Sequence, residues 1–171
     1  MQPLAGTEAR PTNLLLLMNE KDEKEFYIYR RRLPHWRMVD SVYFVTWRLH
    51  PAQLELMPSG RDVIVSTLNH FDGQRYELMA FVVMHNHVHV LLRHEKQHNL
   101  HKIVHSWKSY TANKLQREFA RIGQIWQDEY YDRIVRDEAE FDEKTQYIIN
   151  NPFKTWPEIK EYQWAWFKGD I

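Results

Sequence analysis

The sequence predicts a single α+β domain, and three observations support this fold class. Residues 41–50 are rich in β-branched and aromatic side chains, which favour a strand. Residues 87–89 read His-Val-His, an alternation typical of a strand with two different faces. Residues 99–122 carry apolar side chains at helical spacing. A chain of 171 residues with 43% hydrophobic and 27% charged residues is ordinary for one globular domain.

Composition excludes several kinds of site. Lys and Arg total 23, as do Asp and Glu, so net charge does not indicate a partner. The chain has no cysteine, which excludes disulfides, thiolate metal sites and cysteine nucleophiles. Any metal must be held by histidine, carboxylate or amide oxygen, which favours Mg²⁺, Mn²⁺ or Zn²⁺. The apolar run Leu14 to Met18 is too short to span a bilayer, so we expect a cytoplasmic protein with no membrane partner.

The first part of the chain is expected to be an N-terminal extension over residues 1–25. It lacks a sustained hydrophobic period and ends in a cluster of charges, which fits either a mobile segment or a short docking helix. Residues 26–37 then place four arginines among five aromatic or imidazole rings. Arginines bind phosphates and flat rings stack on bases, so this stretch fits a nucleic-acid arm, although a solvated basic loop fits it equally well.

The next elements are a strand at 41–50, a connection at 51–60 and a helix at 61–71. Gly73 is expected to cap that helix. A second strand is predicted over 75–84, and it leads directly into the histidine-rich stretch.

Residues 81–93 are the stretch where we expect the chemistry. On a strand, His85, His87 and His89 would share one face, while the other face would be apolar. Two imidazoles on one face of a strand can chelate one metal ion or bind one phosphate. The alternative is an exposed polar face whose histidines have no common role. Whether this strand continues the previous one, or forms a hairpin with it bent near residues 77–79, is left open.

A helix is predicted from Asn99 to Ile122, ended by Gly123. Its basic side chains greatly outnumber its acidic ones, and basic residues along a helix can follow a phosphate backbone. A solvated face explains them equally well. These basic residues are Lys102, Lys108, Lys114, Arg117 and Arg121.

An extended segment at 125–136, anchored by Trp126, precedes the last predicted helix. Asp137 is a natural N-cap with Glu140 three residues on, and we expect Pro152 to stop the helix after Asn151.

That helix places Tyr147 and Asn151 one turn apart on one face, where both could reach the same ion or phosphate. A core tyrosine with an asparagine cap is the alternative. The last residues, 153–171, hold three tryptophans and are expected to form a tail packed on the domain.

Four pieces of the sequence, taken together, resemble a known family. The likeness is to the REP-associated tyrosine transposases, relatives of the one-tyrosine IS200-like transposases within the HUH (His-hydrophobic-His) nucleases, and it runs from about Tyr29 to Trp156. The four pieces are Arg31 to Trp36 before a Tyr-Phe-Val-Thr strand, Met84 to His89, Ser106 to Thr111, and Tyr147 to Pro152.

The resemblance implies a fold and a set of site residues. It implies a ferredoxin-like antiparallel sheet with helices packed on it, formed by a transposase-like domain over residues 26–152, with the histidines on a middle strand. It implies that His87 and His89 bind Mg²⁺ or Mn²⁺, that Asn151 is a third polar ligand, and that Tyr147 is the nucleophile. His85 departs from the family, in which proline is common at this position.

The resemblance also implies a substrate. It is single-stranded or hairpin DNA of the palindromic REP type with a short guide sequence, cleaved through a 5′-phosphotyrosine intermediate. Arg31, Arg32, Lys108 and Lys114 are our candidates for DNA contact. A monomer and a homodimer remain equally open.

Two other functions are compatible with the sequence. Residues 85–91 approximate the run of a histidine-triad nucleotide hydrolase, although Asn86 stands where that motif has a hydrophobic residue. A non-catalytic protein that binds hairpin DNA is the other alternative, because a motif shows a capacity for cleavage and not its use.

Overall fold

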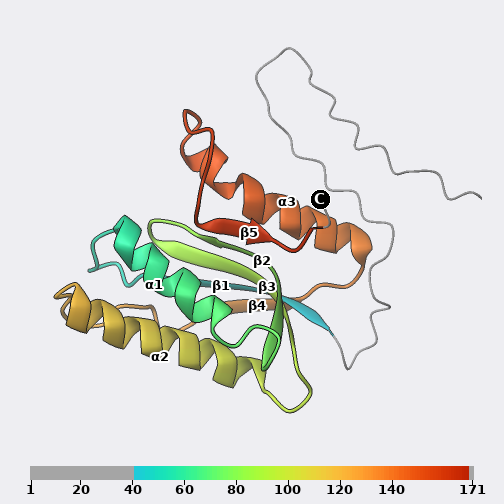
Figure 1. The fold of residues 1–171 in the computed structure, drawn as a ribbon, viewed down its shortest axis with the longest axis horizontal. Coiled ribbons are helices and arrows are strands. Elements are labelled where there is room, and N and C mark those ends of the chain that lie inside the picture. Colours follow the sequence, from blue (N-terminus) through green and yellow to red (C-terminus); the bar gives the residue numbers. More distant parts are fainter. Residues whose placement is uncertain (1–40, 170–171) are drawn as a thin grey trace, which may run out of the picture.

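A computed structural model describes residues 41–169 of the chain. In this part a five-stranded antiparallel sheet has the order β4-β1-β3-β2-β5, with three helices packed on it (Figure 1). The first four strands and two helices follow the βαββαβ order of a ferredoxin-like fold, which confirms the predicted fold class. The elements are β1 (Val42–Arg48), α1 (Pro58–Asn69), β2 (Tyr76–Val83), β3 (His87–His94), α2 (Leu100–Glu118), β4 (Tyr131–Ile134), α3 (Glu138–Thr155) and β5 (Ala165–Phe167).

The sheet separates two hydrophobic cores. Figure 1 shows α1 and α2 on one side of the sheet and α3 on the other. Because side chains alternate along a strand, β3 contributes Val88, Val90 and Leu92 to the core under α1 and α2. It contributes Leu91 to the smaller core under α3, which also holds Ile148. His87 and His89 alternate with these valines and lie on the α3 face of the sheet, where the His89 ring contacts Tyr147.

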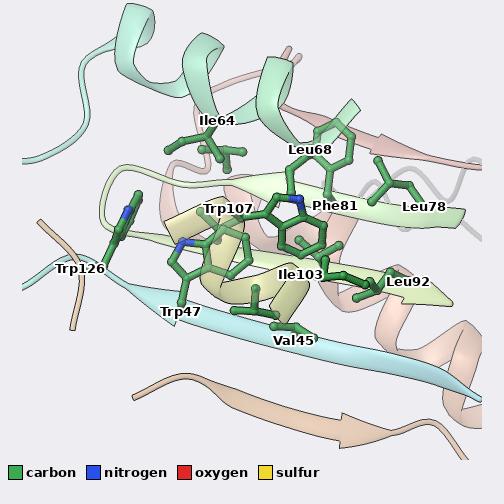
Figure 2. Close-up of a cluster of buried hydrophobic side chains, with 14 of the residues drawn as sticks. Val45, Trp47, Ile64, Leu68, Leu78, Phe81, Leu92, Ile103, Trp107 and Trp126 are labelled. Carbon is green, nitrogen blue, oxygen red and sulfur yellow. The ribbon is translucent and has the colours of Figure 1, made fainter. Parts of the chain in front are cut away.

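Three tryptophans organise the larger core, shown in Figure 2. The rings of Trp47 and Trp107 stack with centroids 5.8 Å apart, and Trp126 meets Trp47 edge-on at 6.2 Å. The Trp107 indole donates to the Tyr76 hydroxyl at 3.0 Å, and the Trp126 indole donates to Thr111 Oγ1 at 2.9 Å. These two indole nitrogens are thereby satisfied, whereas the buried Nε1 of Trp47 has no hydrogen-bond partner among the described residues. The predicted anchoring by Trp126 is confirmed.

Strands β2 and β3 form a hairpin that reverses at residues 84–86. Backbone hydrogen bonds from outside the hairpin hold this turn: the Leu49 amide donates to the Asn86 carbonyl at 2.8 Å, and the Leu56 amide donates to the His85 carbonyl at 2.6 Å. Residues 77–79, where we considered a bend, contain only a shift in register between Leu78 and Ala80. The prediction that His85 shares a strand face with the other histidines is wrong, because His85 lies in the turn.

Helices α1 and α2 differ from the predictions at their boundaries. Helix α1 begins at Pro58, three residues early, because proline is favourable at the first helical position, where no amide partner is needed. The C-cap of α1 is His70, so the prediction that Gly73 caps this helix is wrong. Gly73, with φ of 73°, lies in the turn before β2, and its amide donates to the Tyr76 carbonyl at 2.8 Å. Helix α2 ends at Glu118, before Gly123, and is followed by Ala120 with φ of 51°.

Helix α3 begins as predicted and ends later. Asp137 accepts from the Glu140 amide at 2.8 Å, and Glu140 in turn accepts from the Arg136 amide at 3.0 Å. Pro152 does not stop the helix, which continues to Thr155. Proline in a helix interior sacrifices one backbone hydrogen bond. Pro152 is buried, and its packing offsets that loss.

The chain after α3 completes the sheet. Residues 165–167 add β5 to the free edge of β2, with Phe167 opposite Ala80. Trp156 stacks on Tyr162 at 5.7 Å, and the Tyr162 hydroxyl donates to the Val83 carbonyl at 2.7 Å. No helix among residues 41–169 is long and apolar enough to cross a membrane.

Candidate active site

His89 occupies the centre of the sheet on the α3 face. It lies directly opposite Thr46 in the β1–β3 register, and its Nδ1 is 2.6 Å from Thr46 Oγ1. Only 3% of the residue is exposed. Its other nitrogen, Nε2, is buried and has no hydrogen-bond partner among the described residues. A buried polar atom left without a partner is costly, and a bound ligand would satisfy it.

His87 lies two residues earlier on the same strand face. Its Nδ1 is 2.6 Å from Asn86 Oδ1, and its ring centroid is 4.7 Å from that of His89. The side chain of Asn151 also forms a hydrogen bond with His87. The strand therefore brings two imidazoles together, and the Nδ1 atom of each is within hydrogen-bond distance of a polar side chain.

Both imidazoles are neutral at pH 7. Burial, the positive charge of Arg48 and the neighbouring His85 together lower the pKa of His87 to about 4, against the opposing effect of the hydrogen bond with Asn151. Burial, His87 and Arg48 lower the pKa of His89 to about 3. A neutral imidazole keeps a lone pair free for a metal ion or a hydrogen-bond donor.

Tyr147 and Asn151 reach this site from α3. The Tyr147 ring meets His89 edge-on at 5.1 Å and Phe44 at 6.0 Å, while 41% of the residue stays exposed. Asn151, one turn later, is 9% exposed and bonded to His87. The structure thus gathers the four residues proposed for metal binding and nucleophilic attack around one point of the sheet.

These residues fit a divalent cation. The buried, unpartnered Nε2 of His89, the neutral ring of His87 and the carboxamide of Asn151 offer two nitrogens and one oxygen. Within residues 41–169, no group of three or more His, Cys, Asp or Glu side chains could hold a metal. A set of two histidines and one asparagine leaves coordination positions on the ion for substrate oxygens and water.

His85 lies beside the site but is held differently. Its ring is 6.4 Å from that of His87 and meets Trp156 edge-on at 5.1 Å. Its Nε2 is 3.8 Å from a carboxylate oxygen of Glu55, and its buried Nδ1 has no partner among the described residues.

Two of the candidate DNA contacts, Lys108 and Lys114, are not near the histidines. Lys108 and Lys114 belong to α2, on the opposite side of the sheet from α3 (Figure 1). The Lys108 ammonium donates to the carbonyls of Gln127 and Asp128, both at 2.7 Å, and Lys114 pairs with Glu118 at 3.3 Å. Arg31 and Arg32 lie outside the described residues.

Sequence reasoning missed three residues that support the site. Thr46 orients His89, Asn86 orients His87, and Arg48 places a positive charge beside both. Asn86 is adjacent to His87 in sequence and could have been found. Thr46 and Arg48 depend on the register between β1 and β3, which no local pattern reveals.

Comparison with known families decides the class of this protein. The family model described as "Transposase IS200 like" matches residues 62–151, which is 90 of the 171 residues. The chain belongs to the IS200-like transposase family. The matched region of this IS200-like transposase contains His87, His89, Tyr147 and Asn151, whereas β1, with Thr46 and Arg48, lies before it.

Two solved structures share the fold of this transposase. One is a REP-associated tyrosine transposase bound to a REP hairpin, with 16% identity, a TM-score of 0.63, and coverage of 80% of this chain and 82% of the other. The second, assigned as a transposase, is from Deinococcus radiodurans R1, with 23% identity, a TM-score of 0.50, and coverage of 71% and 97%. No curated protein matches the chain significantly.

Proposed function

We propose that this IS200-like transposase cleaves and rejoins single-stranded DNA through a covalent bond to Tyr147. One observation carries the proposal: the exposed tyrosine packs at 5.1 Å against His89, whose buried Nε2 has no partner among the described residues. A nucleophile next to a vacant ligand atom is the arrangement that metal-assisted phosphoryl transfer requires.

The reaction needs one bond formed and one broken. The Tyr147 oxygen attacks the phosphorus in line with the 3′-oxygen, so a bond from tyrosine to phosphorus forms as the bond to the 3′-oxygen breaks. The phenolic proton passes to solvent and the departing 3′-oxygen takes one up. The products are a 5′-phosphotyrosine and a free 3′-hydroxyl. Because the covalent link conserves the bond energy, a later 3′-hydroxyl can reverse the step and join the strands without ATP.

His87, His89 and Asn151 would hold a divalent cation, Mg²⁺ or Mn²⁺. When bound, such an ion supplies positive charge that polarises the phosphate oxygens and stabilises the transition state. The chain itself keeps the two rings in place through Thr46 and Asn86 and keeps them neutral by burial. Two neutral imidazoles leave most of the charge of the ion available to the phosphate.

The substrate proposed is a hairpin of the REP type with an unpaired segment at the cleavage position. Its support is the shared fold with a transposase that was solved bound to a REP hairpin.

A covalent-adduct assay tests the proposal. Purified protein is incubated with a single-stranded REP hairpin and Mg²⁺ or Mn²⁺, and a denaturing gel is used to detect protein-linked DNA. We expect an adduct with the wild type and none with Tyr147→Phe. Tyr131→Phe is a matched control, since Tyr131 is also exposed but lies on β4. Binding without an adduct would indicate a DNA-binding protein that does not cut, and hydrolysis of nucleotide esters would indicate a histidine-triad hydrolase.

A further inference from the structure

Arg48 is the last residue of β1 and lies directly opposite His87 in the antiparallel register. Residues paired in this way point to the same face of the sheet, with their Cβ atoms about 4.5–5.5 Å apart. The guanidinium is close enough to both His87 and His89 for its charge to act on each ring. Arg48 therefore belongs to the α3 face, at the rim of the candidate active site.

The positive charge of Arg48 is not neutralised by the described residues. The sheet carries two other arginines on this face, and each is paired with a carboxylate: Arg93 with Glu77, and Arg133 with Glu140. Arg48 is exposed, and its guanidinium forms no hydrogen bond or ion pair within residues 41–169. Its backbone carbonyl accepts from the Gln127 amide at 3.0 Å.

A cation that has no partner among residues 41–169 opposes binding of a divalent metal in this position. Like charges within about 10 Å repel each other, and partial burial of the site reduces the screening. Such an arrangement is favourable only when an anion enters together with the metal. A phosphodiester is such an anion, and the planar guanidinium can bind two of its oxygens at once.

We propose that Arg48 binds the non-bridging oxygens of the phosphate that Tyr147 attacks. This inference rests on the proposed function and adds to it a residue that selects for a phosphate at the metal site. Without DNA, Arg48 weakens metal binding. With DNA, it neutralises charge that develops on the phosphate in the transition state.

Three variants of the full chain test the role of Arg48. Arg48→Gln removes the charge, and Arg48→Lys keeps the charge but cannot bind two phosphate oxygens in a bidentate manner. Lys96→Gln is the matched control: it removes the same charge from an exposed residue beyond the other end of β3, which forms no hydrogen bond or ion pair with the described residues.

The first measurement is Mn²⁺ affinity without DNA, by electron paramagnetic resonance. Arg48→Gln is expected to bind Mn²⁺ about 2- to 10-fold more tightly than the wild type, because a repulsive charge is removed. Arg48→Lys and Lys96→Gln are expected to match the wild type. Weaker Mn²⁺ binding by Arg48→Gln would show that Arg48 merely supports the fold of the site, and would overturn the proposal.

The second measurement is the affinity for hairpin DNA as a function of salt concentration, in the non-cleaving Tyr147→Phe background. Loss of one phosphate contact on single-stranded DNA should reduce the slope of log K against log salt by about 0.7 in Arg48→Gln. Affinity should fall about 10- to 100-fold, and Arg48→Lys should recover part of it. An unchanged slope and affinity would overturn the proposal.

These readouts do not depend on cleavage, so the two proposals can fail separately. If the wild type forms no Tyr147-dependent adduct but Arg48→Gln still shows the reduced salt slope, the cleavage function fails and the phosphate contact stands. If the wild type forms an adduct and Arg48→Gln forms it at the same rate, cleavage stands and the role of Arg48 is refuted. If the wild type does not bind hairpin DNA, both are overturned.

Discussion

The hydroxyl of Thr46 lies 2.6 Å from Nδ1 of His89, across the central strand pair of the sheet. For Nε2 of His89 to bind a cation, Nδ1 must carry the proton and donate it to Thr46. A partner of this kind fixes both the tautomer and the orientation of a metal-binding imidazole. Thr46→Val, which keeps the shape but removes the acceptor, should weaken Mn²⁺ binding about 10- to 100-fold, measured by calorimetry. Thr46→Ser should retain wild-type affinity, and weak binding by the serine variant would argue against this role.

Tyr147→Phe should leave stability and DNA affinity nearly unchanged. The ring packs on His89 and Phe44, and phenylalanine keeps those contacts. Within the described part of the chain, the hydroxyl forms no hydrogen bond that the fold would lose. The free energy of unfolding in urea should change by less than about 0.5 kcal/mol. A loss of several kcal/mol would indicate that the tyrosine serves the core.

His87→Ala should reduce metal-dependent cleavage by orders of magnitude, because one of three proposed ligands is lost. His105→Ala is the control, since His105 is an exposed histidine on α2. Adduct formation is followed over a range of Mn²⁺ concentrations. Equal rates for His87→Ala and the control at every concentration would refute the assignment of His87.

The metal-free protein should lose stability as the solution becomes acidic. The folded state holds the pKa of His87 at about 4 and that of His89 at about 3, below the ordinary value of 6.5. Below pH 6.5 the unfolded chain therefore binds protons that the folded chain does not. Stability is complete above pH 6.5 and falls as pH drops toward 4 and then 3, by at most about 1.4 kcal/mol per pH unit for each histidine.

Urea unfolding in EDTA at pH 7 and pH 5 measures this effect. Replacing both histidines with asparagine should reduce the drop between the two pH values. An equal drop in the double variant would assign the acid sensitivity to other groups.

Lys108→Met should destabilise the fold more than it weakens DNA binding. The ammonium donates to two carbonyls of the segment that leads to β4, and loss of such bonds costs about 1–3 kcal/mol. Lys114→Met removes only a surface pair with Glu118 and should cost less than about 0.5 kcal/mol. Chemical denaturation and hairpin binding are measured on both variants. A stable Lys108→Met protein with much weaker DNA binding would support Lys108 as a direct DNA contact.

Local sequence determined the parts of the site that depend on short-range geometry. The alternation of His87 and His89 places both rings on one strand face, and the spacing of Tyr147 and Asn151 places both on one helix face. Asp137 caps α3 through a bond to the amide three residues on. These relationships follow from the periods of the strand and the helix, so they can be predicted without knowledge of the fold.

Only the tertiary structure decided which elements meet. The register that sets Thr46 against His89 and Arg48 against His87 joins residues about forty positions apart, and a shift of one residue would turn both to the other face. The turn that carries His85 is held by amides of residues 49 and 56, and Pro152 continues its helix because it is buried. Packing and pairing between distant segments outweigh local preference at these positions, because burial and long-range hydrogen bonds contribute more free energy than local propensity does.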